Sequence, residues 1–185
     1  TWQKTVGTTL NGKNIGIIGL GKIGKQVAKY AQAFGMHVYA WSPNLTAERA
    51  AEENVNFVES KEEILKISDV ITLHLVSSPS TKGLLTTADF STMKPTALLI
   101  NTSRAALIEE GALVNAVEEN KIAGAAIDVY EEEPLSPDSD YRHCRNLLAT
   151  PHLGYVSDSN YVTYFTQAVE NINGWINGSV IRKLN

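Results

Sequence analysis

Three glycines near the start of the chain constrain its fold more than any other feature. Gly19, Gly21 and Gly24 have the spacing G-x-G-x-x-G, and a short apolar run at residues 15–20 leads into them. This run has no helical periodicity and is bounded by glycines, as is typical of a strand buried on both faces. The apolar residues after Gly21 recur at steps of three and four, which predicts a helix; they are Ile23, Val27, Tyr30, Ala31 and Phe34.

A strand, a glycine turn and a helix in this order form a unit that binds phosphate groups. We expect Gly19 to permit the tight turn, Gly21 to let the backbone approach a pyrophosphate, and Gly24 to let the helix pack close to the strand. The helix N-terminus would offer free N–H groups and a partial positive charge to the anion. A glycine-rich turn in an ordinary α/β protein is the alternative, and the flanking strand and helix patterns disfavour it.

Strands and helices alternate along the whole chain. After a linker at residues 1–13, the patterns predict strands at residues 15–20, 37–41, 55–58, 69–75, 96–102, 122–129 and 146–149. Besides the helix after Gly21, they predict helices at residues 46–53, 60–67, 108–119 and 158–177, and a short one from residue 86 that ends before Pro95. This alternation predicts a doubly wound (Rossmann-type), mostly parallel sheet in a single α/β domain at residues 14–185, with ligands at the carboxyl ends of the strands.

The composition excludes several classes of function. The chain has 185 residues, 43% hydrophobic and 19% charged, which suits one globular domain with a core. The formal net charge is -4 without a basic cluster, so we expect no nucleic-acid partner. No apolar run approaches the roughly 20 residues of a membrane helix, so we expect no membrane partner. Cys144 is the single cysteine, which favours a reducing compartment such as the cytoplasm.

The residue that selects the cofactor should follow the second strand, about 20 residues after the glycines. The chain has Trp41-Ser42-Pro43-Asn44 there, without a carboxylate. An Asp or Glu would bind the ribose 2′-hydroxyl of NAD and repel the 2′-phosphate of NADP, so Ser42 leaves both NAD and NADP open. Arg49 is the nearest cation that could meet a phosphate, and we interpret it as a solvated helix residue.

Three other strand ends carry groups that the reduction of a 2-keto acid requires. Arg104 follows the predicted strand at 96–102, Glu133 closes an acidic run, and His152 lies three residues after the last predicted strand. An arginine can hold a carboxylate and polarise a carbonyl, a histidine can donate a proton, and a carboxylate can keep that histidine charged and oriented. Each residue alone has an ordinary explanation as a surface or loop residue, whereas the set at successive strand ends favours catalysis.

These segments together resemble the nucleotide-binding domain of the D-isomer-specific 2-hydroxyacid dehydrogenase family. The matching segments cover nearly the whole chain in family order: Gly19-Leu-Gly-Lys-Ile-Gly24, Met93-Lys-Pro95, Asn101-Thr-Ser-Arg104, Ala126-Ile-Asp-Val129 with Glu133-Pro134-Leu135, and Thr150-Pro-His-Leu-Gly154. The resemblance implies an NAD(P)-dependent oxidoreductase that transfers a hydride between a nicotinamide cofactor and a small 2-hydroxy or 2-keto acid, such as glyoxylate or hydroxypyruvate. It also implies a homodimer.

The resemblance assigns roles to individual residues. Arg104 would bind the substrate's carboxylate and carbonyl, and His152 would be the acid/base. Glu133 would pair with His152, with Glu132 as the alternative if the register shifts by one residue. Asp128 would hold the nicotinamide carboxamide. The residues implied to bind the cofactor are Gly19, Gly21, Lys22, Ile23, Gly24, Ser42, Val76, Thr102, Ser103, Arg104, Asp128, His152 and Gly154.

The sequence departs from the family pattern in a few places. Ser42 replaces the acidic residue that many members carry, and Ala105 replaces the Gly common after the catalytic Arg. Members of the family also have a second domain ahead of the linker. We therefore expect residues 1–185 to hold the cofactor and the catalytic residues without a complete substrate pocket, and to have little or no turnover alone.

Two other functions stay open. Formate dehydrogenases share the fold but usually have Gln at the position of Glu133, which argues against that function here. Dehydrogenase-related corepressors keep the three catalytic residues, so the sequence leaves a cofactor-sensing interaction module open. No metal is expected, because His143 and Cys144 resemble only half of a metal site.

Overall fold

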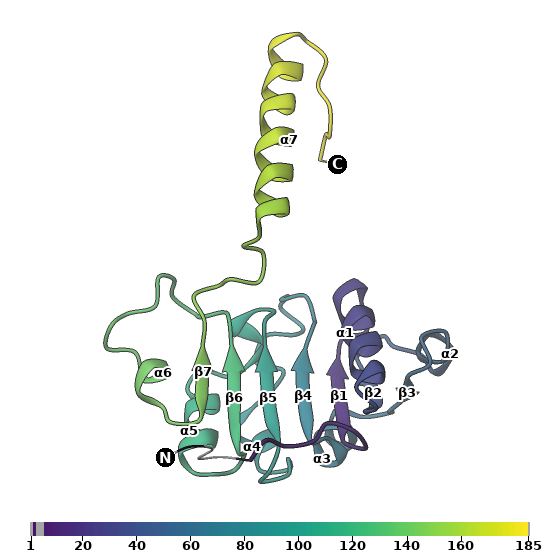
Figure 1. The fold of residues 1–185 in the computed structure, drawn as a ribbon, viewed down its shortest axis with the longest axis vertical. Helices are drawn as coiled ribbons and strands as arrows, with labels where there is room; N and C mark the ends of the chain where they lie inside the picture. Colours follow the sequence, from purple (N-terminus) through teal and green to yellow (C-terminus); the bar gives the residue numbers. More distant parts are fainter. Residues whose placement is uncertain (1, 3–5, 185) are drawn as a thin grey trace. The chain divides into compact units, whose positions relative to one another are not determined.

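A parallel sheet is the framework of the chain (Figure 1). The computed structural model describes residue 2 and residues 6–184. Seven strands lie in the order β3-β2-β1-β4-β5-β6-β7, and the neighbouring strands are parallel throughout. The strands are β1 Asn14–Ile18, β2 His37–Trp41, β3 Asn56–Phe57, β4 Val70–Leu73, β5 Leu98–Asn101, β6 Gly124–Ile127 and β7 Leu147–Ala149. The predicted doubly wound parallel sheet is confirmed.

Helices connect the strands, and most lie within the predicted ranges. They are α1 Lys22–Ala33, α2 Ala47–Ala51, α3 Lys61–Ile67, α4 Thr87–Phe90, the 3₁₀ helix η1 Ala105–Leu107, α5 Ala112–Glu118 and α6 Asp140–His143. The helix predicted from residue 108 begins later, because Gly111 precedes it with a φ of 74° and ends the preceding turn. η1 and α6 were not predicted, because elements of three and four residues are too short to show a helical period.

The order of the strands reverses beside β1. From β1 the chain proceeds outward to β2 and β3, and then returns to β4 on the other side of β1. Connections that leave a parallel sheet in opposite directions open a crevice between the loops that follow the two strands. The loops after β1 and β4 therefore flank the position where a dinucleotide binds in sheets of this kind.

Alternate residues of β1 pack into two separate hydrophobic cores. Ile15 and Ile17 join the cluster that contains part of α1, whereas Ile18 joins the cluster that contains Ile64 of α3. A Cβ on Gly16 would lie 2.9 Å from Ile64 Cγ1, so α3 packs directly against the strand. Helices thus cover both faces of the sheet, which explains why β1 is a continuous apolar run.

The buried face of α1 matches the predicted one only in part, at Ala31 and at the half-buried Val27. The residues that it buries are small: Gly24, Ala28 and Ala31. Ile23, Tyr30 and Phe34, which define the apolar period, are 66%, 65% and 64% exposed. The spacing of large apolar residues identified the helix correctly, but close approach to β1 selects small residues for the inner face.

Residues 152–185 form a second compact unit, which we describe by itself over its described residues. It contains α7 Asp158–Ile176, and the helix predicted at 158–177 is confirmed. Ser157 caps this helix, because its Oγ accepts a hydrogen bond from the Asn160 N–H at 3.3 Å. After α7 the chain turns back, and Arg182 makes an ion pair with Glu170. Over the described part of the chain, no helix combines the length and apolar character that crossing a membrane requires.

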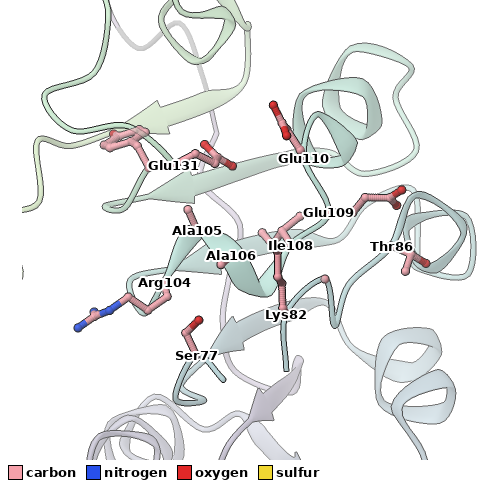
Figure 2. A pocket seen from close by; sticks show the side chains of 12 residues that line it. Ser77, Lys82, Thr86, Arg104, Ala105, Ala106, Ile108, Glu109, Glu110 and Glu131 are labelled. Atoms are coloured by element: carbon pink, nitrogen blue, oxygen red, sulfur yellow. The ribbon is translucent and has the colours of Figure 1, made fainter. Parts of the chain in front are cut away.

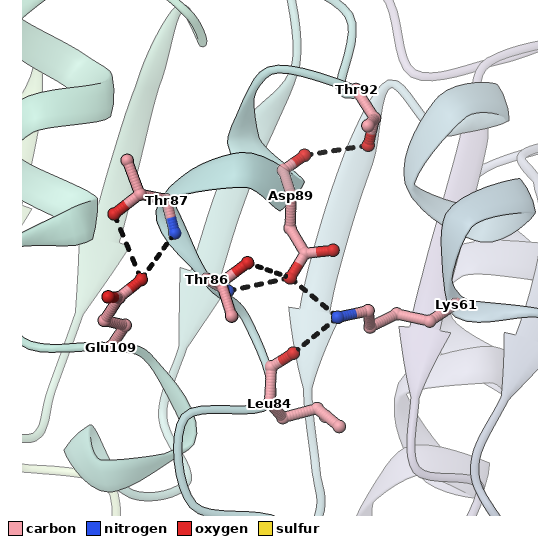
Figure 3. A network of polar contacts seen from close by, with 7 residues as sticks. All are labelled: Lys61, Leu84, Thr86, Thr87, Asp89, Thr92 and Glu109. Carbon is pink, nitrogen blue, oxygen red and sulfur yellow. Dashed lines mark hydrogen bonds and ion pairs between the residues drawn. The ribbon is translucent and has the colours of Figure 1, made fainter.

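A polar network holds α4 in place (Figure 3). Lys61 Nζ lies 2.6 Å from Asp89 Oδ2, and the same carboxylate oxygen accepts hydrogen bonds from the Thr86 N–H at 2.8 Å and Oγ–H at 2.9 Å. Glu109 Oε2 accepts from the Thr87 N–H at 2.7 Å. Burial opposes the charged form of Asp89, but the hydrogen bonds from Lys61 and Thr86 outweigh it and lower the pKa of that carboxyl. The network stabilises the fold only while Asp89 is ionised.

Replacing Asp89 with Asn should lower the free energy of unfolding by about 1–3 kcal/mol at neutral pH, because Lys61 loses its charged partner. The folded-state pKa of Asp89 is lowered, so its contribution is fully present above the unfolded-state pKa of about 3.9 and is lost as the pH falls through the folded-state value. Urea unfolding of wild type and variant at neutral pH and at about pH 3 measures both effects.

The matched control is Asp138→Asn at an exposed position, which should leave the unfolding free energy nearly unchanged. A loss for Asp89→Asn that is the same at both pH values would contradict the assigned role of the charge.

Candidate functional site

The glycine turn after β1 has the geometry that a pyrophosphate site requires. Gly19 has a φ of 105°, and a Cβ there would lie 2.7 Å from the carbonyl of His74. A Cβ on Gly24 would lie 2.2 Å from the Gly19 carbonyl oxygen, so only glycine lets α1 begin this close to the turn. A Cβ on Gly21 would meet no atom within 4 Å. Packing thus requires the outer two glycines, while the middle one faces open space.

The first turn of α1 is free to bind an anion. Gly21 is its N-cap residue, and among the described residues no side chain caps the turn. Its N–H groups and the positive end of the helix dipole are therefore available to a ligand. Lys22 and Ile23 lie in this turn and are exposed. The arrangement fits the pyrophosphate of a dinucleotide.

The loop after β2 carries the residue predicted to meet the ribose. Ser42 follows Trp41 directly and is half-buried, and its carbonyl accepts a hydrogen bond from the Leu45 N–H at 3.1 Å. Arg49 of α2 is exposed, as the sequence predicts, but its Nη1 donates to the Asn44 carbonyl at 3.3 Å. Its guanidinium is therefore held against the loop that contains Ser42.

Hydrogen bonds connect the loops that follow β4 and β5. Ser103 Oγ donates to the Leu75 carbonyl at 2.7 Å, beside Val76, which is 81% exposed. The ring of His74 lies with Nε2 2.9 Å from Thr72 Oγ1. Burial lowers the pKa of His74, so its imidazole is neutral at pH 7. The first residues of the β4 loop thus include a neutral imidazole and an exposed apolar side chain.

Arg104 lies at the margin of an open cavity (Figure 2). The cavity has a volume of about 780 Å³, and residues from the loops after β4, β5 and β6 line it, among them Ser77, Lys82, Thr86, Arg104, Glu109 and Tyr130. The Arg104 side chain is exposed, and its Nη1 donates to the Ser103 carbonyl at 2.6 Å. Thr102 beside it is also exposed. A guanidinium in this position can receive a carboxylate from solvent.

Two carboxylates lie at the end of β6. Asp128 is 5% exposed, and its Oδ1 accepts a hydrogen bond from Thr150 Oγ1 at 2.5 Å. The Tyr130 hydroxyl donates to the Thr150 carbonyl at 2.7 Å. Glu133 Oε1 accepts from the Tyr130 N–H at 3.0 Å, so the chain folds this carboxylate back against the end of the strand. Of the two candidate carboxylates, it is that of Glu133 that makes this hydrogen bond.

His152 is the first residue of the second unit and follows Pro151, the last residue of the first. It has a φ of 54°, and its ring centroid lies 5.8 Å from that of Tyr155 in an edge-to-face arrangement. Gly154 lies in the same short segment before α7. The first unit thus brings Arg104, Asp128 and Glu133 to the carboxyl edge of its sheet. His152 belongs to the second unit.

Asn101 is a polar residue of the site region that the sequence analysis did not select. It is the last residue of β5 and is only 1% exposed. The available signal was a polar residue at the end of an otherwise apolar strand, three positions before Arg104. Its hydrogen bonds, which depend on the folded loop, could not be read from that signal.

A parallel sheet with a glycine turn at the reversal of strand order defines a Rossmann-type, dinucleotide-binding domain. Residues 1–154 match the family model of the D-isomer specific 2-hydroxyacid dehydrogenase, NAD binding domain. The chain belongs to this family, and the resemblance seen in the sequence is confirmed. Membership indicates NAD(H) or NADP as the cofactor.

Several known proteins are similar to the chain. D-3-phosphoglycerate dehydrogenase of Bacillus subtilis (strain 168) is 40% identical over 173 residues, which are 92% of this chain and 33% of that protein. Glyoxylate reductase of Aeropyrum pernix is 36% identical over 175 residues, 95% of this chain and 52% of that protein. A crystal structure of phosphoglycerate oxidoreductase from Vibrio cholerae O395 has a TM-score of 0.89 and 39% identity, covering 94% of this chain and 56% of that one. The chain spans about a third to a half of the length of these curated relatives.

The glycine turn offers a matched pair of variants. Gly21→Ala should change the unfolding free energy by less than about 0.5 kcal/mol, because its Cβ enters open space, yet weaken NADH binding by about tenfold or more. Gly24→Ala should lower the unfolding free energy by about 1–3 kcal/mol, because its Cβ meets the Gly19 carbonyl. Urea unfolding and a fluorescence titration with NADH measure the two effects.

Equal loss of stability in the two variants would contradict the different environments assigned to these glycines. Unchanged NADH affinity in Gly21→Ala would contradict the pyrophosphate site.

Proposed function

We propose that the chain is the coenzyme-binding and catalytic part of an NAD(P)-dependent dehydrogenase that interconverts a small 2-hydroxy acid and the corresponding 2-keto acid. The observation that carries this proposal is the exposed Arg104 at the margin of an open cavity, with the carboxylates of Asp128 and Glu133 at the end of the next strand. Family membership and relatives named for phosphoglycerate and glyoxylate support this substrate class.

The residues divide the chemistry between them. Arg104 holds the substrate's carboxylate and polarises its carbonyl, because a guanidinium presents paired N–H donors to such oxygens. His152 donates a proton to the carbonyl oxygen in reduction and accepts it back in oxidation, while Glu133 orients His152. Asp128, whose carboxylate accepts a hydrogen bond from Thr150 Oγ1, accepts another from the nicotinamide carboxamide. A reduced nicotinamide, when bound, supplies the hydride.

The proposal also includes a further domain, an oligomeric state and a cellular compartment. The relatives are about two to three times longer than the matched region, so we propose that a further domain completes the substrate pocket. We also propose a homodimer in the cytoplasm without nucleic-acid or membrane partners. The net charge of -4 and the single Cys144 support the absence of nucleic acid and the reducing compartment.

A kinetic comparison tests the function. The full-length protein should reduce glyoxylate, hydroxypyruvate or a related 2-keto acid with NADH or NADPH, whereas the 185-residue chain should bind cofactor with little or no turnover. Arg104→Gln should lower kcat/KM for the keto acid by about 100-fold or more, because the carboxylate loses its charged partner. Arg145→Gln makes the same change at an exposed position and should leave kcat/KM nearly unchanged.

Equal activity of the two arginine variants would overturn the role of Arg104. Cofactor binding by the full-length protein without turnover of any 2-keto acid would favour the corepressor-like module, and oxidation of formate would favour a formate dehydrogenase.

A separate prediction concerns the loop after β2 and the preference between NADH and NADPH. Ser42→Asp should shift the ratio of NADPH to NADH dissociation constants toward NADH by about tenfold or more, because a carboxylate binds the 2′-hydroxyl and repels the 2′-phosphate. Fluorescence titrations of the chain with each cofactor measure this ratio. An unchanged ratio would show that Ser42 lies away from the ribose.

A further inference from the structure

Asn101 combines deep burial with a polar side chain. It ends β5 between Leu73 of β4 and Ile127 of β6, and it is 1% exposed. Burying an amide is unfavourable unless both of its ends are hydrogen-bonded. A Leu or Val would suit this position better if packing were its only task. The partners of the amide therefore show what the residue does.

Both ends of the amide bind the backbone of the loop that carries Arg104. Oδ1 accepts a hydrogen bond from the Ser103 N–H at 3.0 Å, and Nδ2 donates to the Arg104 carbonyl at 3.0 Å. That carbonyl also accepts from the Leu107 N–H at 3.3 Å, at the end of η1. The Ser103 hydroxyl ties the same loop to the Leu75 carbonyl at 2.7 Å. Residues 102–104 are thus fixed from the sheet, from η1 and from the β4 loop.

The side chain of Arg104 depends on this backbone for its position. It is exposed, and the hydrogen bond that Nη1 makes is to the Ser103 carbonyl, within the same loop. The backbone sets the positions of its Cα and Cβ, and these limit the points that an exposed guanidinium can reach in any rotamer. A shift of the loop would therefore move the guanidinium away from the place where the substrate's carboxylate binds.

We propose that Asn101 is a positioning residue for the reaction proposed above: its amide holds residues 102–104 in the one backbone conformation that presents Arg104 to the substrate. The inference rests on the proposed function of Arg104. A residue that merely stabilised the sheet would bind other parts of the core, whereas both bonds of Asn101 end on this loop.

A double-mutant cycle in the full-length protein tests the coupling. Asn101→Asp keeps the acceptor for Ser103 and, in its ionised form at alkaline pH, replaces the donor to the Arg104 carbonyl with an oxygen that repels it. It should lower kcat/KM for glyoxylate with NADH by about 10- to 100-fold, with a raised KM for glyoxylate. In an Arg104→Gln background it should have less than about a twofold further effect. Asn115→Asp, at an exposed position of α5, is the control.

Additive losses in the double variant would overturn the inference, since they would show that Asn101 acts other than through Arg104. Wild-type activity of Asn101→Asp would also overturn it. If that variant does not fold, Asn101→Ser replaces it in the same cycle, because the shorter serine side chain has one hydroxyl in place of the separate acceptor and donor of the amide.

Hydrogen exchange tests the loop independently of turnover. In the 185-residue chain, Asn101→Ser should speed exchange of the Ser103 amide by about tenfold or more, while the amides within β5 stay protected. Unchanged exchange at Ser103 would overturn the positioning role. Absence of keto-acid reduction by the unaltered full-length protein would instead overturn the proposed function, and the exchange result would still decide whether Asn101 holds the loop.

Discussion

The contact of α1 with the turn after β1 is the constraint on which the rest of the structure depends. There is no room for a side chain between them, since a Cβ on Gly24 would lie 2.2 Å from the Gly19 carbonyl oxygen. This contact fixes the start of the helix over the carboxyl edge of the central strand. It also explains why the fully buried residues of α1 are glycine and alanine, while Ile23 and Tyr30 are exposed.

The residues of the candidate site that belong to the first unit lie together because the strands of the sheet are parallel. The residues from the first unit lie at or after the ends of the neighbouring strands β5 and β6, and parallel strands end at one edge of the sheet. The side chains differ in how they are held. Asp128 and Asn101 are buried and bonded on the inside of that edge, whereas Arg104 stands exposed on a backbone that its neighbours fix. Rigid inner groups and an accessible cation suit a site that must bind charged molecules from water.

Much of this arrangement could be predicted from the sequence, and there are physical reasons why the other features could not. The glycine spacing and the buried strands predict the parallel sheet, because these signals are local. The predicted inner face of α1 was correct for Val27 and Ala31 and wrong for its larger residues, because periodicity reports where apolar residues recur and not which of them fit against β1. The four residues of α6 are too few to show a period. The partners of Asn101 are invisible in the sequence, since hydrogen bonds to a loop backbone exist only once that loop has folded.

The position of β1 in the sheet has a consequence for how the molecule folds. The crossover that contains α1 joins β1 to β2, whereas the other neighbour of β1, β4, begins only at Val70. Asn14 also binds Asp69 across a separation of 55 residues. Closing this longer stretch of chain costs more conformational entropy than closing the crossover from β1 to β2, so we expect the crevice beside β1 to form late in folding. During synthesis, the glycine turn must therefore emerge long before the strand that completes its surroundings.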